Sequence, residues 1–129
     1  MRQQHHHEPI LIVDDDRDAL DGLGQFLTEA GYPVVCAPDG QEAIDLFLRG
    51  VVPALLIIDL AMPRVAGDEL LRYVQTDPVL REVPVLVVTG APERLVRVVA
   101  DAVIAKPVDL AHLLMQVRRL TGGDRRKAG

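Results

Sequence analysis

Acidic side chains directly follow two short apolar runs of the chain. Three consecutive aspartates begin at Asp14, after the run 10–13, and Asp59 follows the run 55–58. Carboxylates gathered in a small space repel one another unless a cation binds between them. Carboxylate oxygens are the ligands that Mg²⁺ prefers in proteins. If the fold brings the aspartates together, their pattern therefore predicts a divalent cation site.

Two more polar residues follow two further apolar runs. Thr89 comes after the run 85–88, and Lys106 comes after the run 102–105. One Mg²⁺ and the Lys106 ammonium would neutralise three carboxylates and leave a pocket for a phosphoryl group. The Thr89 hydroxyl can donate a hydrogen bond to such a group. A carboxylate is already a nucleophile, so this chemistry needs no bound base.

Composition narrows the class of protein. The 129 residues, 49% of them hydrophobic, fit one domain with its own core. A net charge of -5 argues against a general nucleic-acid binder. No apolar run reaches the roughly 20 residues of a membrane helix, and the polar start of the chain has no signal-peptide core. We therefore expect a cytoplasmic protein that binds neither nucleic acid nor membrane.

Apolar runs alternate with segments of helical periodicity. The runs are 10–13, 33–37, 55–58, 85–88 and 102–105; the helical segments are 20–30, 39–48, 67–76, a short one after Pro92, and 110–120. Runs that are apolar at every position predict strands buried on both faces. We expect Cys36 to be a small core residue of the second strand. The alternation predicts a doubly wound (βα)5 α/β fold, a three-layer sandwich around a five-stranded parallel sheet.

Local signals place several helix ends. Asp16 is expected to cap the first helix, and Asp39 with Glu42 forms a capping-box pattern at the start of the second. Gly31 and Gly122 follow the last periodic residues of the first and last helices. Residues 1–8 are expected to form a disordered tail and residues 122–129 a flexible one.

In open parallel sheets, ligands bind beyond the carboxyl ends of the strands. The polar residues that should meet at this edge are Asp14, Asp15, Asp59, Thr89 and Lys106. Their motifs, taken together and in this order, resemble those of a response-regulator receiver domain of two-component signalling over residues 9–121. The motifs are Ile10-Leu-Ile-Val-Asp-Asp-Asp16, Leu56-Ile-Ile-Asp-Leu-Ala-Met-Pro63 with Gly67, Val87-Val-Thr-Gly-Ala91 and Ala105-Lys-Pro107. The resemblance implies a flavodoxin-like fold.

The resemblance also implies a role for each site residue. Asp59 would be the phosphoacceptor that takes a phosphoryl group from a sensor histidine kinase or a phosphotransfer protein. The implied Mg²⁺ ligands are Asp14, Asp15, Asp59 and the backbone carbonyl of Ala61, while Thr89 and Lys106 would contact the phosphoryl oxygens. Such a domain is a signalling switch that catalyses only its own phosphorylation and dephosphorylation. Its output partner, and whether it forms a homodimer, stay open.

Two features depart from the family pattern. Val103 stands where the family often has tyrosine or phenylalanine, and the segment between Thr89 and Lys106 is about one helical turn short. A shortened fourth helix predicts an unusual partner or dimer geometry. One alternative is a pseudo-receiver, an interaction module that is never phosphorylated. Another is a small aspartate-nucleophile phosphatase, which would need a second aspartate where Ala61 stands.

Overall fold

The computed structural model describes residues 8–59, 66–90 and 100–122. In chain order the elements are β1 (Ile10–Val13), α1 (Arg17–Glu29), β2 (Val34–Ala37), α2 (Gly40–Leu48), β3 (Leu55–Asp59), α3 (Ala66–Thr76), the 3₁₀ turn η2 (Leu80–Glu82), β4 (Val85–Thr89), β5 (Ala102–Ala105) and α4 (Leu110–Leu120). The helix expected after Pro92 lies outside the described residues. So do the expected tails, except for Glu8 and Gly122.

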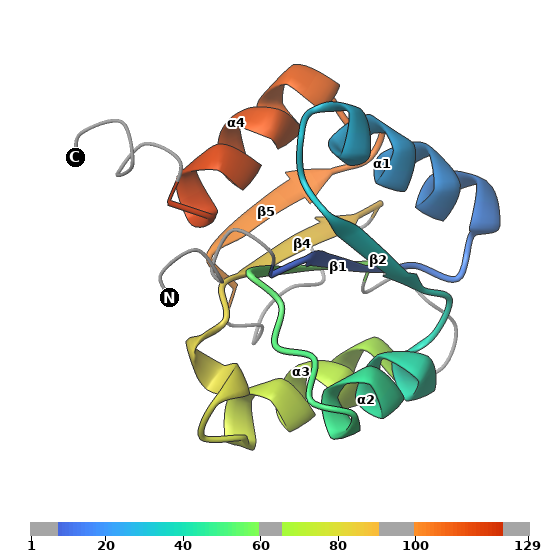
Figure 1. The fold of residues 1–129 in the computed structure, drawn as a ribbon. Helices are drawn as coiled ribbons and strands as arrows, with labels where there is room; N and C mark the ends of the chain where they lie inside the picture. Colours follow the sequence, from blue (N-terminus) through green and yellow to red (C-terminus); the bar gives the residue numbers. More distant parts are fainter. Residues whose placement is uncertain (1–7, 60–65, 91–99, 123–129) are drawn as a thin grey trace.

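The five strands form one parallel sheet in the order β2-β1-β3-β4-β5. Helices α1 and α4 cover one face, and α2 and α3 cover the other (Figure 1). This arrangement confirms the doubly wound, three-layer α/β fold. The order reverses at β1, because β1 pairs with both β2 and β3.

Two apolar cores lie on opposite faces of the sheet. Along β1, Ile10 and Ile12 pack towards α1 and α4, whereas Leu11 and Val13 pack towards α2 and α3. This alternation follows from the two-residue period of a strand. All residues of β1, β3 and β4 are buried, as their continuously apolar sequences predict.

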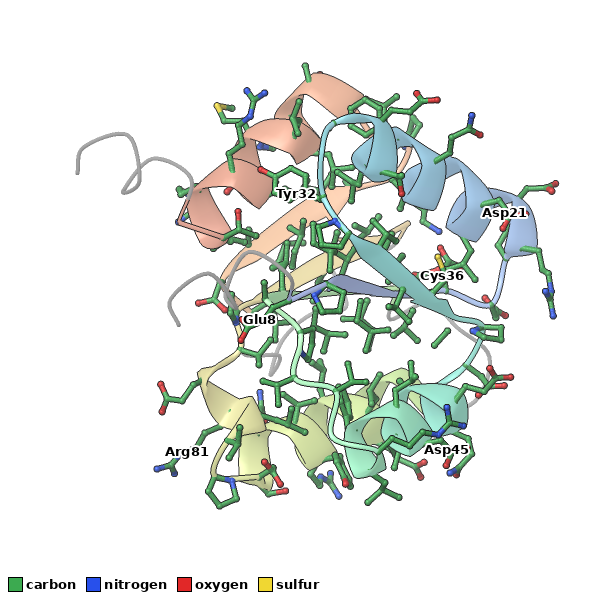
Figure 2. The ribbon with its side chains drawn as sticks, in the orientation of Figure 1. Glu8, Asp21, Tyr32, Cys36, Asp45 and Arg81 are labelled. Atoms are coloured by element: carbon green, nitrogen blue, oxygen red, sulfur yellow. The ribbon has the colours of Figure 1, made fainter. Side chains whose placement is uncertain are left out.

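The two edge strands are less buried than their apolar sequences predict. β2 and β5 are only partly buried, and Cys36 of β2 is exposed and not a core residue. Figure 2 shows Cys36 near Asp21 of α1, at the edge of the sheet. The reason is the strand order, because each edge strand has a partner on one side only. An apolar run indicates a strand but not its place in the sheet.

The helix caps predicted at Asp16 and Asp39 are present in the structure. Asp16 caps α1 by accepting hydrogen bonds from the N–H groups of Asp18 and Ala19. Asp39 caps α2, and its Oδ1 accepts a bond of 2.8 Å from the Glu42 N–H. No helix among the described residues is long and apolar enough to cross a membrane.

Candidate functional site

The carboxyl edge of the sheet collects the polar residues expected there. Asp59 is the last residue of β3 and Thr89 the last of β4, so both still belong to the sheet. Asp14 follows β1, and its N–H donates to the Ala37 carbonyl oxygen. Asp14, Asp59 and Thr89 are 2%, 5% and 2% exposed, and they are the buried polar residues of the described chain. Parallel pairing explains the convergence, because the strands end at the same edge.

Asp14 is also fixed by its own loop. Its Oδ1 accepts a hydrogen bond of 2.9 Å from the Asp16 N–H, two residues further on. Sequence reasoning missed this contact, although an aspartate that bonds a backbone group two residues ahead is a common local motif. The bond holds one carboxylate oxygen against the start of α1. Asp15, between them, is exposed.

Lys106 connects β5 to this acidic edge. Its Nζ lies 3.0 Å from Asp59 Oδ2, where it donates a hydrogen bond, and 3.6 Å from Asp14 Oδ2. The Lys106 side chain is 31% exposed, so it reaches the carboxylates from the solvent side. Its backbone N–H donates to the Thr89 carbonyl oxygen over 2.8 Å. Lys106 therefore joins the ends of β3, β4 and β5.

The electrostatics of the site favour binding of positive charge. Burial raises the pKa of Asp14, and the nearby charge of Asp59 acts in the same direction, although the Asp16 N–H and the Lys106 charge oppose it. For Lys106, partial burial disfavours the charged form. The hydrogen bond to Asp59 and the charges of both aspartates outweigh burial and raise the pKa of Lys106. One ammonium thus faces more negative charge than it neutralises.

Asp14, Asp15 and Asp59 fit a divalent cation. One carboxylate oxygen from each lies within 4.8 Å of the other two. Oxygen ligands at this spacing suit a hard cation such as Mg²⁺, which keeps several of its waters and takes one or two carboxylates. The exposure of Asp15 leaves room for those waters. Ala61, whose carbonyl was expected to be a further ligand, lies outside the described residues.

The structure thus brings together all the predicted site residues that it describes. Asp14, Asp15, Asp59 and Lys106 form one cluster, and Thr89 lies beside it at the end of β4. Val103, three residues before Lys106, is 44% exposed on β5. A cluster of this kind can hold a cation and present a buried carboxylate to an electrophile.

Comparison with protein families agrees with this geometry. The model of the response regulator receiver domain matches residues 10–118 of the chain. The chain belongs to this family. Receiver domains are signalling domains of two-component systems, and response regulator receivers interact with histidine kinases. The matched region spans all five strands of the sheet.

Curated relatives of this receiver domain are response regulators. Response regulator RR06 of Streptococcus pneumoniae is 32% identical over 116 residues, which cover 86% of this chain and 52% of that protein. Response regulator MprA of Mycolicibacterium vanbaalenii is 36% identical over 116 residues, covering 86% of this chain and 49% of that protein. The receiver chain thus spans about half the length of these relatives.

Solved receiver structures share the fold. The signal receiver domain of a signal transduction histidine kinase from Syntrophus aciditrophicus has a TM-score of 0.80 and 34% identity, covering 90% of this chain and 91% of that chain. The response regulator TrrA from Thermotoga maritima, solved in complex with Mg²⁺–BeF, has a TM-score of 0.76 and 27% identity, covering 88% of this chain and 98% of that chain.

Proposed function

We propose that this receiver domain accepts a phosphoryl group on Asp59 in a Mg²⁺-dependent reaction and signals through altered protein contacts. The observation that carries the proposal is the position of Lys106 Nζ, 3.0 Å from Asp59 Oδ2 and beside the cluster of three carboxylates. This arrangement puts a cationic hydrogen-bond donor at the carboxylate that would gain the phosphoryl group. Membership of the receiver family supports the same reaction.

In the proposed transfer, an Asp59 oxygen forms a bond to phosphorus while the phosphorus–nitrogen bond of a donor phosphohistidine breaks. The electron pair of that bond returns to the histidine nitrogen. The residues around Asp59 would contribute mainly by positioning the reacting groups and by stabilising charge. Lys106 and Thr89, both at the carboxyl edge of the sheet, would donate hydrogen bonds to the phosphoryl oxygens.

Asp14, Asp15 and Asp59 would hold the Mg²⁺, with the Ala61 carbonyl as a further ligand. The bound ion would neutralise negative charge on the transferred group. The donor would be a histidine kinase or a phosphotransfer protein. A cytoplasmic location agrees with the single free thiol at Cys36. The domain would catalyse only its own phosphorylation and dephosphorylation at Asp59.

Intact mass measurement tests the proposal directly. The protein is incubated with acetyl phosphate, with and without Mg²⁺, beside the Asp59→Asn variant. We expect a gain of one phosphoryl group in the wild type with Mg²⁺ and none in Asp59→Asn. Asp45→Asn is a matched control, because Asp45 lies on α2 and bonds Gln41 there. It should be phosphorylated like the wild type.

The alternatives give different results in the same experiment. Equal phosphorylation of Asp59→Asn and the wild type would place the acceptor elsewhere. A wild type that gains no phosphoryl group and binds neither Mg²⁺ nor beryllofluoride would instead be an interaction module of the pseudo-receiver type. Release of inorganic phosphate from small phosphomonoesters, with turnover, would indicate the phosphatase.

A further inference from the structure

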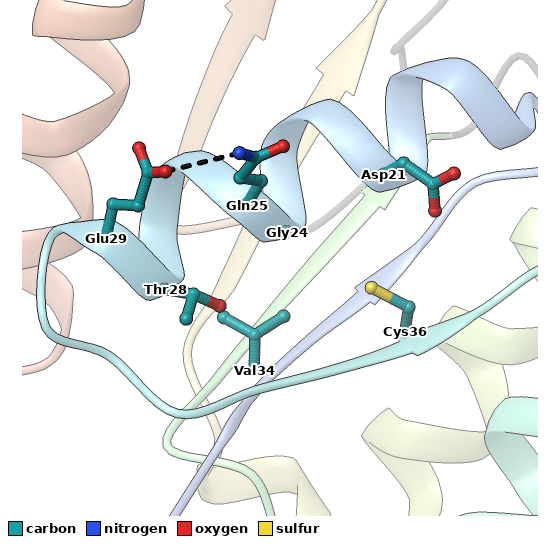
Figure 3. Close-up of a pocket in the computed structure, with 7 residues that line it drawn as sticks. All are labelled: Asp21, Gly24, Gln25, Thr28, Glu29, Val34 and Cys36. Carbon is teal, nitrogen blue, oxygen red and sulfur yellow. Dashed lines mark hydrogen bonds between the residues drawn. The ribbon is translucent and has the colours of Figure 1, made fainter.

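A groove of about 420 Å³ runs between α1 and the edge strand β2 (Figure 3). Val34 and Cys36 of β2 form its floor, and four α1 side chains form its wall. These are Asp21, Gln25, Thr28 and Glu29. Val34 also packs against the apolar core on the α1 and α4 face, and the groove lies at the edge of the sheet rather than at the carboxyl ends of the central strands.

Close packing of α1 on β2 fixes the inner side of the groove. A Cβ atom at Gly24 would lie 3.2 Å from Cys36 Sγ and 3.7 Å from Val34 Cγ1. The helix therefore approaches the strand more closely at Gly24 than most residues with a Cβ atom do. The wall and the floor of the groove are held together, so the groove is a formed surface feature.

The open side of the groove is a free strand edge. The Pro33 and Ala37 carbonyl oxygens accept from the N–H groups of Ile10 and Asp14, so these carbonyls point towards β1. The N–H and C=O groups of successive residues point to opposite sides of a strand. The N–H and C=O groups of Val34 and Cys36 therefore point away from β1. Within the described residues no strand pairs with this edge. A free edge is a template for another extended segment.

The negative charge of the groove determines which kind of extended segment can bind beside β2. Asp21 and Glu29 stand about two helical turns apart along the groove. Partial burial of the Cys36 thiol and the nearby Asp21 charge both raise the pKa of that thiol. A strand added beside β2 would direct every second side chain towards these carboxylates. A second copy of this chain would bring its own Asp21 and Glu29, which repel.

We propose that this groove and the free edge of β2 bind an extended, basic segment of a partner protein by strand addition. Backbone hydrogen bonds to Val34 and Cys36 would hold the segment. Its alternate lysine or arginine side chains would pair with Asp21 and Glu29. The proposal does not depend on the phosphoacceptor role of Asp59, because the groove uses none of the site residues.

Binding of a model peptide to the full chain tests the proposal. The probe is a capped peptide of alternating valine and lysine, about six residues long like an ordinary strand. We expect saturable binding by calorimetry and slower hydrogen exchange at the Val34 and Cys36 amides. A peptide of the same length with glutamate in place of lysine should not bind.

Matched variants separate strand addition from general attraction to a negative protein. Asp21→Asn should weaken binding about threefold to fivefold, and adding Glu29→Gln should bring the loss to about tenfold. Asp45→Asn makes the same change of net charge on α2, on the other side of the sheet (Figure 2), and should leave binding unchanged. Val34→Pro removes one outward N–H and should abolish the protection at Cys36.

Three results would overturn the proposal. Equal weakening by Asp21→Asn and Asp45→Asn would show that binding is non-specific, and so would the absence of protection at Cys36. The third is a wild type that is dimeric without peptide and already protected at the Val34 and Cys36 amides. The occupant of the edge would then be a second copy. None of these results bears on phosphorylation of Asp59.

Discussion

Lys106 Nζ lies 3.0 Å from Asp59 Oδ2, although the two residues are 47 positions apart in the chain. The same ammonium is 3.6 Å from Asp14 Oδ2. Two largely buried carboxylates thus share one partly exposed cation. Removing that cation would leave two buried carboxylates facing each other. The stability of the domain and its affinity for a divalent cation are therefore linked at this point.

Lys106→Met should destabilise the domain. The variant keeps most of the aliphatic side chain but removes the charge, so we expect a loss of about 1–2 kcal/mol at pH 7, less than for a fully buried pair. In the wild type this contribution is complete below pH 10.5 and is lost as the pH rises through the raised pKa of Lys106. Urea denaturation at several pH values measures both effects.

Arg81→Met is the matched control for that variant. Arg81 lies 3.9 Å from Glu82, and the two side chains are 63% and 80% exposed. An exposed pair contributes little, so we expect less than about 0.5 kcal/mol of change. A comparable loss in both variants would contradict a specific role of Lys106.

Asp14→Asn should stabilise the protein in metal-free buffer. Because burial raises the pKa of Asp14 above its ordinary 3.8, the folded protein binds this proton more tightly than the unfolded chain does. Stability therefore falls as the pH rises from 3.8 through the raised pKa, and the ionised carboxylate costs stability at pH 7. Asparagine keeps the acceptor for the Asp16 N–H without the charge. The gain should be largest near neutral pH and shrink below 3.8.

Magnesium should reverse this order of stability. A ligand that binds only the folded state at about 100 times its Kd adds about 2.7 kcal/mol. We expect this gain in the wild type and little of it in Asp14→Asn or in Asp15→Asn. Thermal unfolding with and without Mg²⁺ measures the difference. An equal gain in all three proteins would show that the ion binds elsewhere.

The two glycines within α1 should respond differently to alanine. Nothing lies within 4 Å of a Cβ atom at Gly22, whereas a Cβ atom at Gly24 would meet Cys36 Sγ at 3.2 Å. Alanine is favoured over glycine in a helix by about 1 kcal/mol. Gly22→Ala should therefore stabilise the domain by about 0.5–1 kcal/mol. Gly24→Ala should gain less or lose stability, because Cys36 must move. Equal gains measured by denaturant titration would contradict the close packing of α1 on β2.

Asp101 should stabilise the start of β4. Its Oδ2 accepts a hydrogen bond of 2.8 Å from the Val85 N–H, and its own N–H donates to the Val85 carbonyl oxygen over 2.8 Å. Asp101→Ala leaves a buried N–H without this acceptor, so we expect a loss of about 1–2 kcal/mol and faster exchange of the Val85 amide. Asp101→Asn keeps an acceptor oxygen and should lose less. If the two variants are equally stable, the side-chain bond contributes nothing.

The sequence correctly predicted structural features that depend on only a few neighbouring residues. The caps at Asp16 and Asp39 and the helix ends before Gly31 and Gly122 follow from side chains that bond nearby backbone and from glycines at positive φ. The burial of Cys36 was predicted wrongly, because an apolar run does not tell a central strand from an edge strand. Which strand lies at an edge depends on pairing between distant segments.

The features of the candidate site can also be separated into those that the sequence determines and those that depend on the fold. The sequence by itself determined that a carboxylate follows β1, that Asp59 and Thr89 stand at the ends of β3 and β4, and that a lysine follows β5. The reason is that the apolar runs define the strands and parallel strands end at one edge. Only the tertiary structure decided that Lys106 contacts both Asp59 and Asp14 and that α1 and β2 leave a groove beside a free edge. Both depend on strand order and on how closely the helices pack against the sheet, which no local pattern encodes.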